Sequence, residues 1–307
     1  MPNSSIAIVT PTLNQGAYIE KTILSVLEQQ NVSVEYIVVD GGSTDDTADI
    51  LKRFQTDIQW VVKLGMGQSA AINWGWRQTK APVLAWLNSD DVLLPRALER
   101  VVRLFSGSSE SDIVYGKCDF IDQHGDYIAA YPTRDFNYPE YVSGAENFIP
   151  QPSTFLKRQV FESLGGVDEG LNFLLDFDYW IRAGLVFKID HFPETLSQLR
   201  LHSEAKSIKR LNGFANELVS IYSRFFTRPD LPQSILDLRK KGLRNANLIA
   251  ANISSWGQDF SAARTFALAS YRINPLKPSP FLPFYLMGKP GLNVIMHLQK
   301  NPYIKYT

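Results

Sequence analysis

The sequence predicts an α/β fold: a mostly parallel sheet with helices on both faces, followed by a helical C-terminal region. In the first third of the chain, short β-branched runs alternate with segments of helical periodicity. From about Lys209 the pattern is helical, until a set of prolines interrupts it. The chain has 307 residues, 45% of them hydrophobic, which is enough for one sizeable core and a smaller appended unit.

Four strand and helix pairs account for the first third. The expected strands are 6–10, 34–39, 58–62 and 83–87. Each is a short apolar run bounded by turn residues, which is typical of a buried strand. The helices follow at 18–30, around Ile50, Leu51 and Phe54, at 68–78, and behind Pro95 at 96–105.

The regular alternation of strands and helices does not continue beyond the first third of the chain. A hairpin is expected from 112–121 and 127–131, with the turn at 123–126. Further along we expect a strand at 151–156, a short helix at 176–183, an extended segment at 187–201, and helices at 211–227, 233–253 and 259–273. We therefore expect two regions, 1–208 and 209–307.

The expected sheet also predicts where a ligand binds. In open parallel α/β sheets, ligands bind beyond the carboxyl ends of the strands. The segments that follow the strands are 11–15, 40–43, 63–67 and 88–91.

Asn88-Ser89-Asp90-Asp91 places two carboxylates directly after an apolar strand. Such a position is costly unless a partner compensates the charge, and a divalent cation would do so. Mg²⁺ or Mn²⁺ typically binds one or two carboxylates together with substrate phosphates. The alternative is that both acids only cap the helix behind Pro95.

Three other segments carry weaker signals. Asp40, before two glycines, suits a hydrogen bond to a ribose or base, or is an ordinary turn residue. The segment 65–67 leads into a helix whose N-terminus favours a phosphate. Of Asp176 and Asp178, one can act as a base while the other caps the helix or pairs with Arg182, or both belong to a solvated helix start.

Together these segments resemble the family 2 glycosyltransferases with the GT-A fold. The resemblance covers roughly residues 5–207. It rests on the order and spacing of these runs: Val9 to Asn14, Val38 to Asp45, Gly67-Gln68 with Asn73, Leu87 to Asp91, Gln151 to Thr154, and Asp176 to Trp180.

The resemblance implies a role for individual positions on the donor side. Thr10 and Pro11 correspond to the loop beside the nucleobase, and Asp40 to the acid that binds the base or ribose. Gln68 and Asn73 correspond to positions that contact the donor.

The resemblance also implies a metal, Mn²⁺ or Mg²⁺. Asn88, Ser89 and Asp90 occupy the family's Asp-x-Asp position, where Asn88 replaces the first acid and makes the ribose contact through an amide. Asp90 is then the metal-binding acid, with Asp91 beside it. His202 matches a position that contacts metal or diphosphate, although a histidine between extended residues is more often structural.

For the catalytic base, the resemblance implies Asp176. Leu175 replaces the glutamate that usually precedes it, so Asp178 is the other acid nearby and the choice between the two stays open.

We therefore expect an inverting glycosyltransferase that uses a UDP-, GDP- or dTDP-sugar. Its acceptor would be a glycan or lipid-linked molecule of cell-surface polysaccharide synthesis. One alternative is a nucleotide-sugar-binding module without catalysis. Another is a sugar nucleotidyltransferase, but the loop 11–16 lacks the basic residues that would hold a triphosphate.

Charge and cysteine content bear on partners and location. The formal net charge is zero, so no nucleic acid partner is expected. Cys118 is the single cysteine, the N-terminus has no signal-peptide pattern, and no apolar run is long enough to span a bilayer. We expect a cytoplasmic protein.

The C-terminal region adds a hypothesis about peripheral contact with the inner face of the plasma membrane. After Asp237 the only acidic residue is Asp259, among many Lys and Arg. Such charge, with Trp256, Phe281, Phe284, Tyr285 and Leu286, suits an anionic membrane and a lipid-linked acceptor. A helical cap or an oligomer contact explains the region equally well.

Overall fold

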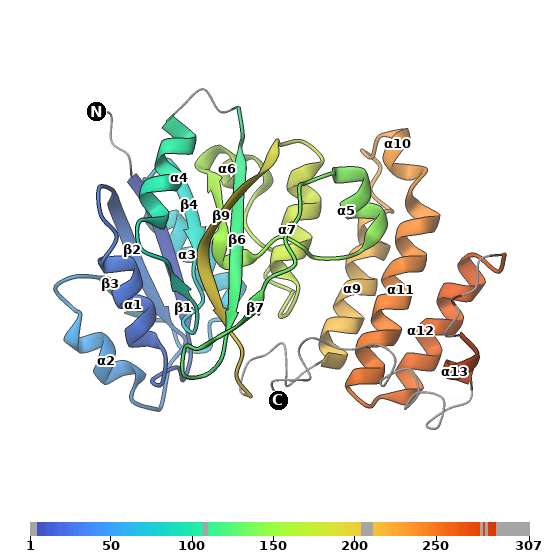
Figure 1. The fold of residues 1–307 in the computed structure, drawn as a ribbon, viewed down its shortest axis with the longest axis horizontal. Helices are drawn as coiled ribbons and strands as arrows, with labels where there is room; N and C mark the ends of the chain where they lie inside the picture. The colour runs from blue at the N-terminus through green and yellow to red at the C-terminus, as the bar shows by residue number, and fades with distance from the viewer. Residues whose placement is uncertain (1–4, 107–109, 204–210, 277–278, 280–281, 287–307) are drawn as a thin grey trace. The chain divides into compact units, whose positions relative to one another are not determined.

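The computed structural model describes residues 5–106, 110–203, 211–276, 279 and 282–286 (Figure 1). The chain divides into two compact units. The first contains Met1–Phe136 and Phe148–Arg200, and the second contains Asn137–Asn147 and Leu201–Thr307. The division therefore lies after Arg200, before the expected boundary at 208, and a short internal segment joins the second unit.

The elements of the first unit follow one another as strand and helix up to α4. They are β1 Ser5–Thr12, α1 Ile19–Leu27, β2 Ser33–Asp40, α2 Thr47–Arg53, β3 Gln59–Val62, α3 Gln68–Gln78, β4 Val83–Trp86, β5 Val92–Leu93, α4 Ala97–Ser106, β6 Ile113–Ile121, β7 Tyr127–Ala130, a 3₁₀ turn Gln151–Ser153, β8 Thr154–Lys157, α6 Arg158–Leu164, α7 Leu175–Gly184 and β9 Ile189–Arg200.

The strands form one nine-stranded sheet in the order β3-β2-β1-β4-β8-β6-β9-β5, with β7 paired to β6. The half built from β3, β2, β1 and β4 is parallel. The other half is mixed, because β8 runs antiparallel to β4 and β6, while β9 is parallel to β6. The predicted α/β class is confirmed, and the parallel pairings are concentrated in the half formed by β3, β2, β1 and β4.

Helices cover both faces of the parallel half. Ile6 and Ile8 of β1 pack in one cluster with Ile23 of α1 and Val101 of α4. Val9, which points the other way, lies against Gly75 of α3. Side chains alternate across a strand, so α1 and α4 lie on one face and α3 on the other.

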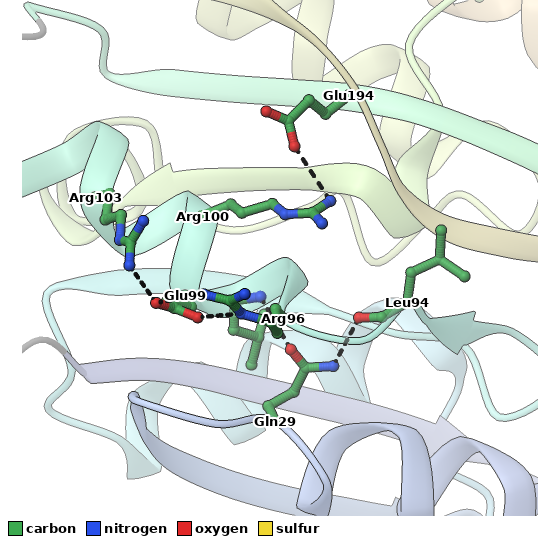
Figure 2. Close-up of polar contacts among 8 residues, drawn as sticks. Gln29, Leu94, Arg96, Glu99, Arg100, Arg103 and Glu194 are labelled. Carbon is green, nitrogen blue, oxygen red and sulfur yellow. Dashed lines mark hydrogen bonds and ion pairs between the residues drawn. The ribbon is translucent and has the colours of Figure 1, made fainter.

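Polar side chains fix α4 at the edge of that core (Figure 2). Gln29 donates to the carbonyl of Leu94 at 2.9 Å and accepts from the N–H of Leu98 at 3.1 Å. Glu99, which is only 6% exposed, pairs with Arg96 at 2.7 Å and with Arg103. The hydrogen bond from Arg96 lowers the pKa of the Glu99 carboxyl to about 2.

We expect Glu99→Gln to lower the melting temperature at pH 7 by a few degrees. A carboxyl whose pKa falls on folding stabilises the protein above its unfolded pKa, near 4.3, and this contribution is lost as the pH falls towards 2. Thermal unfolding of both proteins from pH 7 to pH 2 tests this. A difference in melting temperature that stays constant over that range would contradict it.

Some boundaries differ from the expected ones. β1 continues through Pro11 to Thr12, two residues beyond the expected end, because its pairing with β2 continues to Asp40. The strand expected at 151–156 begins only at Thr154, since Gln151–Ser153 forms a 3₁₀ turn. The short elements β5 and α6 were not predicted.

The second unit is helical where it is described. Its helices are α5 Tyr138–Gly144, α9 Leu211–Phe225, α10 Gln233–Leu236, α11 Arg239–Trp256, α12 Phe260–Ile273 and α13 Leu282–Leu286. The Tyr222 hydroxyl donates to the carbonyl of Val142 at 2.8 Å, and Asn245 donates to that of Ser143 at 2.9 Å. These bonds attach α5 to α9 and α11.

One residue of the membrane hypothesis is corrected here. Tyr285 is 1% exposed and packs against Ala251, Ala263 and Ala267, so it cannot face a lipid surface. Phe281 and the basic residues Lys277, Lys289, Lys300 and Lys305 lie outside the described residues, as do the side chains of Phe284 and Leu286. Among the helices that are described, none is both long and apolar enough to cross a membrane.

Candidate active site

The loops after β1 and β2 are joined to each other at the carboxyl edge of the sheet. The backbone N–H of Asn14 donates to Ser43 Oγ at 2.8 Å, and the side chain of Asn14 accepts from the N–H of Thr44 at 2.8 Å. The N–H of Gly16 donates to Asp45 Oδ2 at 2.9 Å. Two of the segments that carry the resemblance, 9–14 and 38–45, are thus joined at this edge.

Asp40 ends β2 at this edge and is 1% exposed. Its Oδ1 accepts from Ser43 Oγ at 2.6 Å, Ser43 N at 3.0 Å and Gly42 N at 3.2 Å. Gly42 has φ of +102°, which a side chain would strain. Thr12 is the register partner of Asp40, and its buried hydroxyl has no hydrogen-bond partner in the described part of the chain.

Thr10 and Pro11 lie inside β1 rather than in the loop beyond it. Thr10 is fully buried, and its hydroxyl bonds the Tyr36 hydroxyl at 3.1 Å, where burial raises the pKa of the phenol. Pro11 pairs with Val39. The side chain of Thr10 therefore belongs to the core, and Thr12, which sequence reasoning missed, carries the unpaired group at the edge.

A chain of amides begins at the N-terminus of α3 and crosses the end of β4. Gln68 Nε2 donates to Asn88 Oδ1 at 2.9 Å, and Asn88 Nδ2 donates to Gln151 Oε1 at 3.0 Å. Gln151 Nε2 in turn donates to the carbonyl of Trp86 at 2.6 Å. Asn88 needs a donor and an acceptor in this chain, so an amide suits it where a carboxylate does not.

Asp91 is held inside the protein. Its Oδ1 accepts from the N–H of Arg200 at 3.0 Å, and its Oδ2 accepts from Asn88 at 3.3 Å. Burial, followed by the negative charge of Asp90, raises the pKa of the Asp91 carboxyl well above its usual value. The Arg200 side chain donates to the carbonyl of Asp90 at 3.0 Å, so Arg200 holds both Asp90 and Asp91. Ser89, between Asn88 and Asp90, is buried. Sequence reasoning missed this role of Arg200.

The donor set here suits a hard divalent cation with few protein ligands. Both oxygens of Asp91 accept protein hydrogen bonds. The family resemblance gives the metal to Asp90, whose carboxylate is half-buried. Within the described residues, no three His, Cys, Asp or Glu side chains gather closely enough to hold a metal. One carboxylate plus substrate phosphates is a common arrangement for Mg²⁺. His202 is buried and belongs to the second unit, so its role as a ligand stays a prediction.

The structure separates the two acids of α7. Asp178 Oδ2 accepts from Arg182 Nε at 2.8 Å, one turn further on, and the Arg182 guanidinium lies over the ring of Tyr179. Asp176 lies in the first turn of the same helix and is half-buried. Asp178 is engaged in a largely buried ion pair, and Asp176 is the position to which the family resemblance gives the role of proton acceptor.

The first turn of α7 is anchored next to the amide chain. The ring of Trp180 stacks on that of Trp86, with centroids 5.8 Å apart and an angle of 20° between the planes. Ser69, next to Gln68, donates to the carbonyl of Leu171 at 2.9 Å, shortly before α7 begins. The arrangement therefore brings the elements that carry Asp40, Asp90 and Asp176 to the same edge of the sheet.

Asn73 lies one turn beyond Ser69 in α3. Its side chain is 3% exposed and hydrogen-bonds Val167 and Glu169 in the loop before α7.

Known proteins resemble this chain in sequence and in fold. An "Uncharacterized glycosyltransferase" of Rickettsia felis is 28% identical over 230 residues, which cover 72% of this chain and 38% of that protein. One of Nostoc sp. is 26% identical over 270 residues, covering 77% of this chain and 82% of that protein. The chain thus spans well under half of the Rickettsia felis relative.

Two solved structures share the fold at low identity. Residues 1–349 of S. aureus TarS, in complex with UDP-GlcNAc, superpose with a TM-score of 0.67 at 16% identity, covering 92% of this chain and 87% of that one. The mannosyltransferase PcManGT of Pyrobaculum calidifontis, in complex with GDP-Man and Mn²⁺, gives 0.63 at 17% identity, covering 100% and 85%. The expected GT-A fold is confirmed.

The family itself is shown by the sequence. The model of "Glycosyl transferase family 2" matches residues 7–165, just over half of the chain, from β1 through the amide chain to the start of the loop before α7. The chain therefore belongs to glycosyl transferase family 2.

Proposed function

We propose that this chain is an inverting glycosyltransferase, which moves a sugar from a nucleoside diphosphate donor to a hydroxyl group of its acceptor. The observation that carries the proposal is the position of the acids in the loop after β4 and at the start of α7. Asp90 and Asp176 carry half-buried carboxylates on elements that lie at one edge of the sheet. Their neighbours Asp91 and Asp178 accept hydrogen bonds from Arg200 and Arg182. Asp90 suits a cation with phosphates, and Asp176 suits an incoming hydroxyl.

The nucleoside end of the donor would bind at β1 and β2. The buried Thr12 hydroxyl lacks a partner among the described residues, and all hydrogen bonds that the described residues make to the Asp40 carboxylate end on its Oδ1. Asp40 Oδ2 and Thr12 Oγ1 are then the groups that meet a ribose or base. Ligand binding beyond the ends of adjacent parallel strands is the rule for such sheets.

The transfer is a single displacement. The acceptor oxygen forms a bond to the anomeric carbon as the bond from that carbon to the β-phosphate oxygen breaks. Asp176 takes the hydroxyl proton, and the electron pair leaves with the nucleoside diphosphate. A base on the face opposite the leaving group gives inversion.

Asp90 would hold the divalent cation, Mn²⁺ or Mg²⁺. A bound cation of this kind supplies Lewis-acid stabilisation of the charge on the leaving phosphate.

A thermal-shift screen of UDP, GDP and dTDP with Mn²⁺ tests the donor class. A ligand that binds only the folded state stabilises it by about 2.7 kcal/mol at a hundred times its Kd. The neighbours in complex with UDP-GlcNAc and GDP-Man make UDP and GDP the first choices. A melting temperature unchanged by all three nucleotides at millimolar concentration would contradict the proposal.

Labelled UDP-GlcNAc and GDP-mannose distinguish an enzyme from a binding module. A glycosyltransferase slowly hydrolyses or transfers the sugar of its own donor, whereas a module without catalysis protects it. A sugar nucleotidyltransferase would instead need a nucleoside triphosphate, and the loop 11–16 carries no basic residue for one.

The acceptor and the cellular role rest on the family resemblance. We propose a glycan or lipid-linked acceptor in cell-surface polysaccharide synthesis. Liposome co-sedimentation of the whole chain, with vesicles that contain anionic lipid, tests whether the protein meets such an acceptor at a membrane.

Asn88→Asp, which restores the acid of the Asp-x-Asp pattern, is expected to harm the site rather than improve it. A carboxylate oxygen in place of Nδ2 would face Gln151 Oε1 and the Asp91 carboxylate. Gln151 cannot turn its amide round, because Trp86 O needs its donor. Unpaired buried groups of this kind cost about 1–3 kcal/mol, which urea unfolding can measure.

The control for this variant is Asn137→Asp. The Asn137 side chain caps α5 by accepting from the N–H of Glu140, a role that a carboxylate fills equally well. If Asn88→Asp were as stable as wild type and bound nucleotide with Mn²⁺ more tightly, the role of the amide chain would be wrong.

A further inference from the structure

We infer that Asn73 is a positioning residue, which sets the place of the base helix α7 through the loop before it and makes no contact with the donor. The inference rests on the proposed function, because it assigns a task to a residue near the proposed base. It departs from the family resemblance, which places Asn73 among the donor contacts.

The Asn73 amide is used almost completely within the protein. Its Nδ2 donates to Val167 O at 2.9 Å and to Glu169 Oε1 at 2.9 Å, and its Oδ1 accepts from Val167 N at 2.9 Å. An amide has two N–H donors, and both are taken. No N–H of Asn73 remains for a phosphate or a sugar hydroxyl, and the side chain is 3% exposed.

These bonds hold one loop, residues 164–171, which we call the clamp loop. From the α3 side, Asn73 holds Val167, and Ser69 donates to Leu171 O at 2.9 Å. From the α7 side, the Tyr179 hydroxyl donates to Gly165 O at 3.2 Å, and Arg182 donates to Gly166 O at 3.1 Å. The clamp loop therefore connects α3 and α7 by hydrogen bonds on both of its sides.

Close packing makes the connection rigid at Gly166. A Cβ atom added there would lie closer to Asn73 Oδ1 than the 3.0 Å below which real Cβ atoms are essentially never found. The fit between the Asn73 amide and the clamp-loop backbone thus requires glycine at position 166.

The N-terminal half of the same helix also serves the donor side. Gln68 begins α3 and donates to Asn88, which precedes Asp90, while Ser69 and Asn73 hold the loop that leads to Asp176. A rigid helix that holds both parts fixes the distance between the leaving group and the base. A misplacement of about 1 Å in such a geometry can cost ~100-fold in rate.

Two variants disturb the contact between Asn73 and the clamp loop, one from each partner. Asn73→Asp keeps the shape but replaces the donor Nδ2 by an oxygen, which repels Val167 O and the Glu169 carboxylate. Gly166→Ala places a Cβ atom where the Asn73 amide lies, so either the amide or the backbone at position 166 must move. We expect each to lower kcat for hydrolysis of UDP-GlcNAc or GDP-mannose by about 10- to 100-fold, while the Kd for UDP or GDP with Mn²⁺ changes less than about twofold.

A rescue and a control accompany these variants. Adding Glu169→Gln to Asn73→Asp restores one hydrogen bond with the donor and acceptor exchanged, so part of the lost kcat should return. Gly144→Ala, where the added Cβ meets nothing within 4 Å, should behave as wild type. A residue with a merely structural role would not be expected to show the separation of kcat from Kd together with rescue.

The inference is overturned if Asn73→Asp and Gly166→Ala weaken nucleotide binding as much as turnover, because Asn73 would then be a donor contact. Unchanged kcat in both variants overturns it as well. Failure of the proposed function looks different: the wild-type protein itself would then bind neither UDP nor GDP and hydrolyse neither sugar nucleotide.

Discussion

Asp176→Asn is expected to leave nucleotide binding intact and to lower sugar transfer by at least ~100-fold. General-base catalysis by a positioned carboxylate typically contributes about 10²–10⁴ in rate, and an amide of the same shape cannot accept the proton. Asp176 and Asp178 both lie in the first turn of α7, and Asp178 forms an ion pair with Arg182. The measurement is kcat for hydrolysis of UDP-GlcNAc or GDP-mannose, beside the Kd of the nucleoside diphosphate.

Asp178→Asn is the matched control on the same helix. It removes the charge that faces Arg182 in a pair whose side chains are only 12% and 21% exposed. We expect it to lower the free energy of unfolding by roughly 1–3 kcal/mol and to reduce kcat by less than about tenfold. We therefore expect Asp176→Asn to lose catalytic rate and Asp178→Asn to lose stability.

The opposite result would assign the role of the base to Asp178. If Asp178→Asn lost turnover while Asp176→Asn kept it, the proton acceptor would be Asp178, and the pair with Arg182 would belong to catalysis. Near-normal turnover in both variants would remove general-base catalysis by α7 from the mechanism.

Much of the fold could be predicted because local patterns and tertiary structure agree in the first unit. The β-branched run at Ile6 and the helical spacing of Ile19 and Ile23 predict elements that the sheet then uses. The antiparallel pairings of β8 could not be predicted, because strand direction depends on long-range pairing. The 3₁₀ turn before Thr154 was missed for a related reason: the buried Gln151 side chain bonds Asn88 and the carbonyl of Trp86, which are distant in sequence.

The candidate site was predicted unevenly for a physical reason. Residue type and spacing indicate which side chains suit a ligand, but not which of them the protein engages itself. Thr10, Asn73 and Asp91 have the right chemistry, yet their polar groups are bound by Tyr36, Val167 and Arg200. Thr12 has no such partner among the described residues, and no local pattern separates it from Thr10.

Asp90→Ala is expected to abolish the gain in nucleotide affinity that Mn²⁺ provides. Asp91 cannot replace Asp90, because both of its oxygens accept protein hydrogen bonds and burial favours its neutral form. The variant should therefore bind UDP or GDP equally weakly with and without Mn²⁺. Calorimetric titration of each nucleotide, in Mn²⁺ and in EDTA, measures this dependence directly.

Asp49→Ala is the control for charge removal, since that side chain is exposed and pairs only with the exposed Lys52 in the described part of the chain. It should keep the full Mn²⁺ dependence. If Asp90→Ala kept that dependence too, the cation would have to be held by other groups. The assignment of Asp91 to a structural role would then be wrong as well. The two titrations thus test whether a carboxylate beside a buried, hydrogen-bonded acid can bind the cation with phosphates as its other ligands.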